Sequence, residues 1–190
     1  MDYMGNKDYW DEKFYRRGEN LFSPEKILVE SIGCFKAGTV LDVACGDGRN
    51  TIFLLENDFK VTAIDFSEKA LERLNKFSIL DGHSVIVKQV DLSIKDALKD
   101  IGVFDNIVIN HYRLSKEILN VIYRNINRGG ILFINGFGAN HKVDDKITKD
   151  DLIYDNDFDE IKDYFELVNH IESTNEIGVF STYIFRKNNN

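Results

Sequence analysis

The chain has 190 residues, a length that fits one domain with a substantial hydrophobic core, so we predict a single domain over residues 1–190. Hydrophobic residues make up 43% and charged residues 29%, proportions that are ordinary for a globular protein and argue against disorder. The 24 Lys and Arg residues against 32 Asp and Glu residues give a formal net charge of −8. Because such a chain repels phosphate backbones, its charge disfavours a nucleic acid partner and favours a small molecule.

The sequence carries no signal for export, membrane insertion or structural cysteine chemistry. Residues 1–8 contain no cationic stretch followed by an apolar one, and nowhere do about 18 apolar residues follow one another, so we predict a cytoplasmic protein outside the membrane. Cys34 and Cys45 have no C-x-x-C spacing, which predicts neither a disulfide framework nor a metal site. Cys45 lies in a glycine-rich stretch, where we favour a packing role over a nucleophilic one. No pattern indicates an oligomeric state.

The N-terminal part predicts two helices. Residues 8–19 are aromatic and charged with a weak helical period that ends in a turn at Gly18, and the simplest interpretation is a helix that packs Trp10 and Phe14 on the edge of the core. Ser23 followed by Pro24 is typical of an N-cap and first helical position, which predicts a helix that runs to Gly33 or slightly beyond.

The stretch from residue 39 to residue 51 organises the chain. Apolar residues at its start predict a buried strand, and Ala44, Gly46 and Gly48 then let a ligand approach the backbone. The dinucleotide pattern G-x-G-x-x-G would need glycine at position 51, where Thr51 stands. Asp42 at the strand end is also unsuited to a pyrophosphate, whereas it suits an amino group or another cation.

A second acidic strand end follows. Residues 49–57 predict a helix whose free N–H groups offer a site for an anion, and residues 59–67 predict the next strand. Asp65 ends this strand 23 residues after Asp42, close to the spacing at which an acidic side chain accepts hydrogen bonds from a ribose diol. The alternative is an acidic residue at a helix N-terminus, since Ser67 is a candidate cap for the next helix.

The rest of the chain alternates between strands and helices and then ends in a hairpin. Residues 138–154 are polar and without a period, and are either a loop over a substrate or a surface insertion. A role for His141 as a ligand in that stretch is the less favoured interpretation. We predict strands at 84–92, 104–111, 131–137, 167–173 and 178–186, and helices at 96–101, 116–125 and 158–165, with a glycine cap at 127–130. This order predicts an α/β fold with a seven-stranded doubly wound sheet that closes with a C-terminal antiparallel hairpin.

Residues 42–48 resemble the first motif, acidic-x-G/A-x-G-x-G, of class I S-adenosylmethionine-dependent methyltransferases, and the resemblance covers nearly the whole chain. It implies a Rossmann-like fold and S-adenosyl-L-methionine as cofactor. It also places Asp91 and Leu92 beside the adenine, although Asp91 is alternatively a cap of a loop turn. Arg128 departs from the usual proline of the family. The donor-binding residues implied are Tyr9, Trp10, Asp42, Ala44, Gly46, Gly48, Asn50, Asp65, Phe66, Asp91, Leu92 and Asn110.

The opening Tyr9-Trp10-Asp11 with Phe14, followed by Arg17-Gly18-Glu19, resembles the small-molecule methyltransferases of the tellurite-resistance and thiopurine type. This closer resemblance implies that residues 1–22 form a lid over donor and substrate, with Tyr9, Trp10, Tyr15 and Phe22 near the pocket. Residues 23–187 would then form the core, and residues 188–190 a frayed end.

In this family the segment after the fourth strand lies beside the transferred methyl group, which makes His111, Tyr112 and Arg113 the catalytic candidates. The ordinary pKa of histidine, near 6.5, suits His111 as a base, although contact with substrate or donor is favoured. The resemblance predicts methyl transfer to a small thiol, chalcogen oxyanion or other heteroatom nucleophile. The alternatives are a protein or RNA methyltransferase, and a regulatory module that binds S-adenosylmethionine without catalysis.

Overall fold

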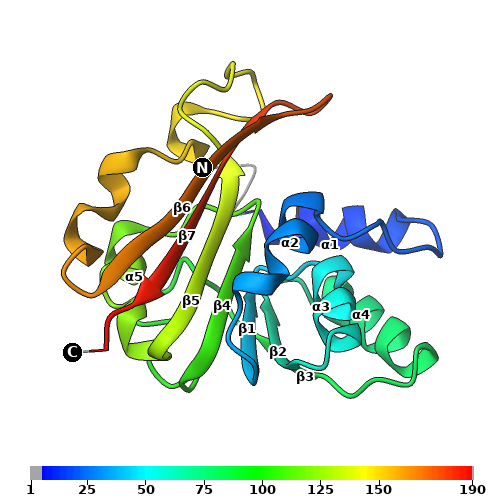
Figure 1. The fold of residues 1–190 in the computed structure, drawn as a ribbon. Helices are drawn as coiled ribbons and strands as arrows, with labels where there is room; N and C mark the ends of the chain where they lie inside the picture. The colour runs from blue at the N-terminus through cyan, green and yellow to red at the C-terminus, as the bar shows by residue number, and fades with distance from the viewer. Residues whose placement is uncertain (1–5, 190) are drawn as a thin grey trace.

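The computed structural model describes residues 6–189 and contains one seven-stranded sheet in the order β3-β2-β1-β4-β5-β7-β6 (Figure 1). Strands β1 to β5 are parallel, whereas β7 runs antiparallel to both β5 and β6. The predicted α/β fold with a C-terminal antiparallel hairpin is confirmed. The strands are β1 (Thr39–Val43), β2 (Lys60–Asp65), β3 (Ile86–Gln89), β4 (Phe104–Asn110), β5 (Ile126–Phe137), β6 (Phe165–Thr174) and β7 (Val179–Lys187).

Helices cover both faces of the sheet, as Figure 1 shows. Successive strand residues point to opposite faces, so Val40 packs with one layer of helices while Leu41 packs with the other. Both side chains are fully buried, as expected for a parallel sheet between two layers. One layer holds α2 (Lys26–Ser31), α3 (Arg49–Glu56) and α4 (Glu68–Leu80), and the other holds α5 (Lys116–Leu119), η2 (Ile122–Asn125) and η4 (Asp155–Ile161).

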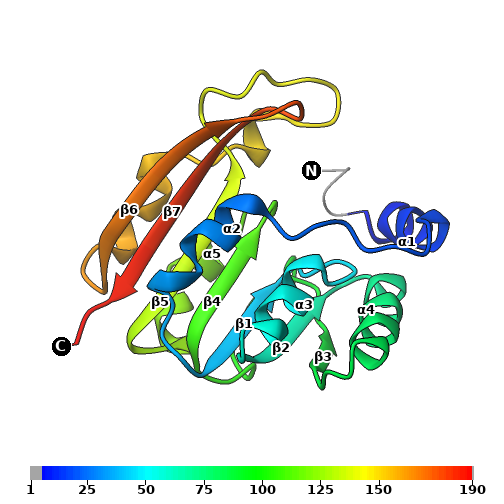
Figure 2. The same ribbon diagram turned by 45° about the vertical axis from the view of Figure 1, so that its right-hand side comes forward.

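Helix α1 (Lys7–Arg16) lies beside α4, as Figure 2 shows. Its Asp11 carboxylate accepts hydrogen bonds from Ser67 Oγ at 2.5 Å and from Lys69 N at 3.3 Å, at the start of α4. Phe14 is the buried residue of α1. The structure therefore agrees with the predicted packing of this amphipathic helix against the core edge.

Two predicted helices differ from the structure in the part of the chain before β4. Ser23 is not a cap: α2 begins at Lys26, and its N-cap is Glu25, whose N–H donates to Asn50 Oδ1 at 2.9 Å. The prediction of a helix at 96–101 is wrong, because the segment is a run of turns. Asp96 has a left-handed φ of 61°, which interrupts helical geometry where the helix was to begin.

Two further helices and one cap need correction in the second half. The helix predicted at 116–125 divides into α5 and η2, and the helix predicted at 158–165 is the short 3₁₀ helix η4, after which Phe165 already belongs to β6. Gly129, with φ 69°, does not cap a helix, since β5 begins three residues earlier at Ile126. These short segments are stabilised by packing rather than by helical period.

Some predictions concern the ends of the chain. Asn188 is anchored, because its N–H donates to Tyr164 O at 2.9 Å and its side-chain amide to Asp163 O at 3.1 Å. Residues 1–5 of the predicted lid and Asn190 of the predicted frayed end lie outside the described residues. Among the helices that are described, none has both the length and the apolar character needed to cross a bilayer.

Candidate functional site

A cavity of about 550 Å³ opens at the carboxyl ends of β1, β2 and β4, with α1 on its other side. In open α/β sheets this edge is where ligands bind. Among the predicted site residues, those that line the cavity are Trp10, Asp42, Ala44, Gly46, Asn50, Asp65, Phe66, Asp91, Leu92, Asn110, His111 and Tyr112. Gly48, Tyr9 and Arg113 do not line it. We call this space the donor cavity.

The glycine turn after β1 brings the backbone to the wall of the cavity. Gly46 and Gly48 have left-handed φ angles of 57° and 93°, which suit glycine. A Cβ on Gly48 would lie 2.3 Å from Leu74 Cδ1, so this glycine allows the turn to pack directly on α4. Ala44, with φ 55°, adopts the same region despite its side chain. Such strain is typical of a segment shaped for a ligand.

Asp65 is held rigidly beside this turn. Its Oδ2 accepts from Gly46 N and its Oδ1 from Ser67 N, each at 2.9 Å. The side chain is 6% exposed, and burial raises the pKa of Asp65 despite these hydrogen bonds. A carboxylate oxygen can accept a second hydrogen bond, and Asp65 lines the cavity, so its side chain is suited to accept hydroxyl groups of a ligand. Ser67 also caps α4 as predicted, since its Oγ accepts from Ala70 N at 3.1 Å.

Asp42 is the second acidic strand end in the donor cavity. Thr51 Oγ1 donates to Asp42 Oδ2 at 2.6 Å, so the residue that breaks the dinucleotide pattern positions this carboxylate. Burial raises the pKa of Asp42 to about 7, while the Thr51 hydrogen bond acts in the opposite direction. No Lys, Arg or His side chain forms an ion pair with Asp42 or Asp65 in the described part of the chain. Asp42 is therefore available to pair with a cationic group of a ligand.

Asp91 caps a loop turn and also lines the donor cavity, while its contact with adenine stays a prediction. Its Oδ1 accepts from Ser93 N at 2.8 Å and from Ser93 Oγ at 2.7 Å, so it caps a loop turn. The residue also lines the donor cavity together with Leu92, and no described hydrogen bond reaches its Oδ2. The acidic ends of three neighbouring strands thus surround one space.

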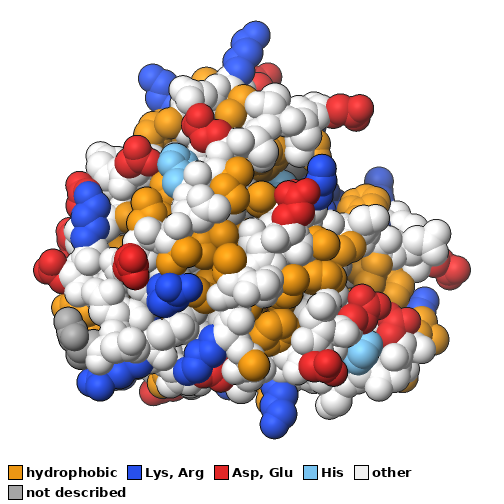
Figure 3. Space-filling model, viewed as in Figure 1, with side chains coloured by type: hydrophobic (Ala, Val, Ile, Leu, Met, Phe, Trp, Pro, Cys, Tyr) orange, Lys and Arg blue, Asp and Glu red, His pale blue; other side chains and the backbone are white. Residues whose placement is uncertain are grey.

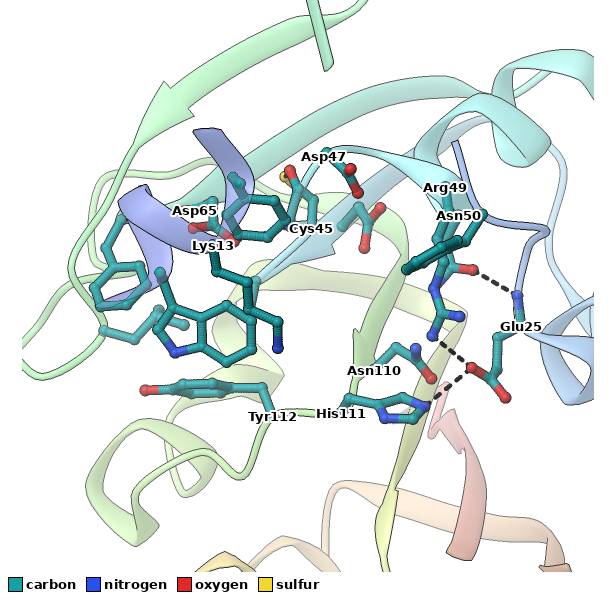
Figure 4. Close-up of a pocket in the computed structure, with 18 of the residues that line it drawn as sticks. Lys13, Glu25, Cys45, Asp47, Arg49, Asn50, Asp65, Asn110, His111 and Tyr112 are labelled. Atoms are coloured by element: carbon teal, nitrogen blue, oxygen red, sulfur yellow. Dashed lines mark hydrogen bonds and ion pairs between the residues drawn. The ribbon is translucent and has the colours of Figure 1, made fainter. Parts of the chain in front are cut away.

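A carboxylate network joins α2, α3 and the end of β4 (Figure 4). Arg49 donates to Glu25 Oε2 at 2.6 Å, and His111 Nε2 lies 3.0 Å from the same oxygen. The hydrogen bond with His111 is the main reason why the pKa of Glu25 falls to about 2. Glu25 is therefore ionised at working pH and fixes the orientation of the imidazole.

His111 is also constrained through its backbone. It has a left-handed φ of 55°, and its N–H donates to Asn135 O at 2.7 Å. The ring centroid lies 4.9 Å from that of Phe180 on β7. With Nε2 directed at Glu25, Nδ1 is the ring nitrogen left for a ligand. This arrangement resembles the base and orienting carboxylate of many active sites, in which the carboxylate sets the tautomer.

The other two catalytic candidates have different environments. Tyr112 lines the donor cavity, and burial raises its pKa to about 12, so it is a hydrogen-bond donor and not a base near neutral pH. Arg113 turns away from the cavity and forms an ion pair with Asp157 at 2.6 Å. Arg113 therefore lies outside the lining of the donor cavity, and its catalytic role stays a prediction. Cys45 lines the cavity, but burial raises the pKa of its thiol, which agrees with packing and not with a nucleophilic thiolate.

The N-terminal segment forms the far wall of the donor cavity. Trp10, Phe14 and Phe22 line it as aromatic side chains, whereas Tyr9 and Tyr15 do not. Arg17 pairs with Asp47 of the glycine turn at 2.8 Å, and its guanidinium lies 4.7 Å from the Phe22 ring centroid. The segment is thus tied to the turn by charge as well as by apolar contacts.

A second cavity, of about 590 Å³, adjoins the first, and both are lined by Trp10, Lys13, His111 and Ile177. Its remaining walls come from the loop after β5 and from the tip of the β6–β7 hairpin. No three His, Cys, Asp or Glu side chains of residues 6–189 are arranged to hold a metal ion, and the prediction that the site needs none stays a prediction.

Sequence reasoning missed several residues of the two cavities. Glu25 was assigned only to a helix start, and it reaches His111 across 86 positions of sequence. Lys13 and Ile177 come from opposite ends of the chain, so no local pattern could join them. Asp47 stands inside the glycine turn, and that position could have identified it.

Comparisons with known proteins agree with this geometry. TehB from Haemophilus influenzae superposes with a TM-score of 0.71 at 20% identity, covering 95% of this chain and 66% of TehB. The N-methyltransferase NodS from Bradyrhizobium japonicum WM9, solved with S-adenosyl-L-homocysteine, gives a TM-score of 0.71 at 14% identity, covering 96% and 98%. These likenesses show the fold, which is the Rossmann-like fold of class I methyltransferases.

The sequence comparisons identify the family. Residues 35–182 match the family described as Methyltransferase domain. YqeM of Bacillus subtilis (strain 168), a protein named for a methyltransferase activity, is 28% identical over 106 aligned residues, and the match covers 52% of this chain and 42% of YqeM. The chain thus spans less than half of that curated relative. It belongs to the methyltransferase-domain family.

Proposed function

We propose that the protein transfers a methyl group from S-adenosyl-L-methionine to a small-molecule acceptor, as a methyltransferase related to the tellurite-resistance and thiopurine type. One observation carries the proposal: the acidic ends of β1, β2 and β3 and the glycine turn line a single cavity of about 550 Å³. Such a cavity has the volume of a small-molecule site and the charge for a sulfonium amino acid. A dinucleotide fits less well, because Asp42 would face its pyrophosphate.

The donor can be assigned to the cavity group by group. Asp65 accepts the ribose hydroxyls with the lone pairs that Gly46 and Ser67 leave free. Asp91 and Leu92 contact the adenine, and Asp42 faces the positively charged methionine part. Trp10 and Phe14 supply aromatic faces, which attract a sulfonium by about 0.5–2 kcal/mol when water is excluded.

Methyl transfer asks little of the protein beyond alignment. A lone pair of the acceptor forms a bond to the methyl carbon while the bond from that carbon to the sulfonium breaks, and its electron pair leaves S-adenosyl-L-homocysteine neutral. Holding the two reactants in line supplies much of the rate. Where the acceptor carries a proton, His111 Nδ1 takes it while Glu25 holds the other side of the ring.

The acceptor is proposed to be a small thiol, a chalcogen oxyanion or another heteroatom nucleophile. The resemblance of residues 9–19 to the tellurite-resistance and thiopurine type supports a thiol or chalcogen acceptor. NodS, which is named as an N-methyltransferase, supports nitrogen acceptors as well. The net charge of −8 opposes RNA as an acceptor.

The remaining organisation is also proposed. The chain forms one domain in the cytoplasm, and its N-terminal segment serves as a lid. Support for the lid comes from Arg17, which joins this segment to Asp47 of the glycine turn, and from Phe22, which lines the donor cavity. Release of these contacts would open the cavity to the donor.

Calorimetric titration of the purified protein tests the proposal. We expect S-adenosyl-L-methionine and S-adenosyl-L-homocysteine to bind in the micromolar range and NADH not to bind. A protein that binds neither sulfur ligand would contradict the proposed function. Binding followed by formation of S-adenosyl-L-homocysteine with thiols, chalcogen oxyanions or amines would distinguish the enzyme from a regulatory module, which would bind without turnover.

A further inference from the structure

The second cavity adjoins the donor cavity at His111, the residue next to which we place the methyl group that is transferred. His111, Trp10, Lys13 and Ile177 line both spaces, so an occupant of one cavity reaches the occupant of the other at this junction. The second cavity has a volume of about 590 Å³, which suits a small organic molecule. That space is far more than an inorganic oxyanion of a few atoms would fill.

The second cavity is basic although the protein is acidic overall. Lys13, Lys142 and Lys146 line it, and Asp144 is its single acidic side chain. Asp144 Oδ1 accepts two backbone N–H bonds from its own loop, from Lys146 and Ile147, each at 2.7 Å. The Asp144 carboxylate therefore stabilises the backbone of its own loop. In Figure 3, basic side chains project at the top of the molecule, where Figure 1 places this loop.

No acidic side chain of residues 6–189 forms an ion pair with these three lysines. Lys13 is a positive charge in a partly buried place, without an acidic partner among these residues. Its ammonium lies 4.1 Å from the Trp10 ring centroid. Burial lowers the pKa of Lys13, and the neighbouring charges of Arg17 and Lys146 lower it further. An anion placed among these groups would relieve this repulsion.

The cavity also offers an aromatic wall and a further donor. The rings of Phe137 and His141 lie 4.3 Å apart between centroids. Since Val179 N donates to His141 Nδ1 at 3.2 Å, the neutral ring carries its hydrogen on Nε2, which is left to donate to an anionic oxygen. A Cβ on Gly178 would lie 2.2 Å from the His141 ring, so glycine is needed there for the ring to keep this position.

We propose that the second cavity is the acceptor site and that the acceptor is a small organic anion, a carboxylate or phosphate ester with an apolar or aromatic body. Its anionic group is bound by Lys142, Lys146 and His141, and its nucleophilic atom lies at the junction beside His111. This inference rests on the proposed function and adds the charge class of the substrate.

The site can be tested by binding, independently of turnover. The protein is saturated with S-adenosyl-L-homocysteine and titrated with 4-(mercaptomethyl)benzoate and 4-aminobenzoate, and with the neutral amide of each. We expect each anion to bind at least about fivefold more tightly than its amide, and the preference to fall with added salt. The double variant Lys142→Gln/Lys146→Gln is expected to remove most of this preference.

The matched control is Lys95→Gln/Lys99→Gln, which removes the same charge from an exposed loop outside both cavities and should leave the preference intact. Equal affinity for anions and amides, or an unchanged preference in Lys142→Gln/Lys146→Gln, would overturn the inference. Selenite binding with the same lysine dependence and no binding of the organic anions would also overturn it. Because S-adenosyl-L-homocysteine binding is measured first, failure of the donor site is recognised separately.

Discussion

The two cavities that meet at His111 differ in charge and in construction. The donor cavity is lined by the ends of parallel strands, and its carboxylates Asp42, Asp65 and Asp91 form no ion pair among the described residues. The second cavity is bounded by α1, an irregular loop and a hairpin tip, and it gathers lysines. A cationic donor and an anionic acceptor would each find the opposite charge, and they would approach each other only at the junction.

The construction of each cavity explains whether its ligand can be inferred from the sequence or only from the structure. Strand ends and a glycine turn hold polar atoms within tenths of an ångström, so the donor class follows from a short motif. Loops tolerate substitution and insertion, and substrate specificity is commonly placed on them. The acceptor class therefore has to be inferred from the assembled structure.

The largest loss of stability is expected at Gly48, where the glycine turn packs directly on α4. Gly48→Ala combines a left-handed φ of 93° with a Cβ 2.3 Å from Leu74 Cδ1 and should lower the free energy of unfolding by about 2 kcal/mol. Gly82→Ala is the control, because its φ is 73° but its Cβ meets nothing within 4 Å, and it should cost about 1 kcal/mol. Urea unfolding measures both, and equal losses would show that packing on α4 contributes nothing.

Asp65→Ala tests whether the acidic wall binds the donor. We expect at least a tenfold loss of S-adenosyl-L-methionine affinity, about 1.4 kcal/mol, because two ribose hydroxyls lose their acceptor. Calorimetry at fixed pH provides the measurement, and Asp58→Ala on the exposed surface is the matched control. Unchanged donor affinity in Asp65→Ala would contradict the ribose assignment.

Most residues that the sequence assigns to the donor side line one cavity in the structure, because the signals that identify them are local. The apolar strand, the glycines at 46 and 48 and the acidic residue at 65 each stand in a short pattern whose physical meaning does not depend on distant residues. The alternation of strands and helices, with the final hairpin, was likewise confirmed by the sheet order.

The sequence was insufficient where tertiary contacts decide. Segments 96–101 and 158–165 have helical composition, yet each is too short to be helical without packing that favours it. Arg113 was assigned to the site from its place after β4, but the partner that turns it away, Asp157, lies 44 positions later. The contact between Glu25 and His111 also joins residues that are distant in the sequence.

Glu25→Gln probes the junction itself. The amide cannot hold both Arg49 and His111 as the carboxylate does at 2.6 and 3.0 Å, so kcat should fall about fivefold to tenfold. Donor affinity should change by less than about threefold, since Glu25 is proposed to act through His111. Glu30→Gln, an exposed residue that pairs with Lys26 at 3.6 Å, is the control. A loss confined to donor affinity would place Glu25 in donor binding instead.

The smallest effect is a pH dependence of donor binding. Burial raises the pKa of Asp42 to about 7, so below that pH its side chain is mostly protonated in the free protein. A cationic donor favours the carboxylate, and its binding should therefore release a proton near neutral pH. We expect S-adenosyl-L-methionine affinity to rise about threefold between about pH 6 and about pH 7.5, and Asp42→Asn to abolish the rise.

The variant is needed because burial also raises the pKa of Asp65, so the wild-type profile alone would not assign the titrating group. Comparing the two sulfur ligands then locates the charge that Asp42 faces. S-adenosyl-L-homocysteine keeps the amino group but lacks the sulfonium, so a pH dependence shared by both ligands would place Asp42 at the amino group. A dependence seen only with S-adenosyl-L-methionine would place Asp42 near the sulfonium, and the acidic wall would then reach the transferred methyl group.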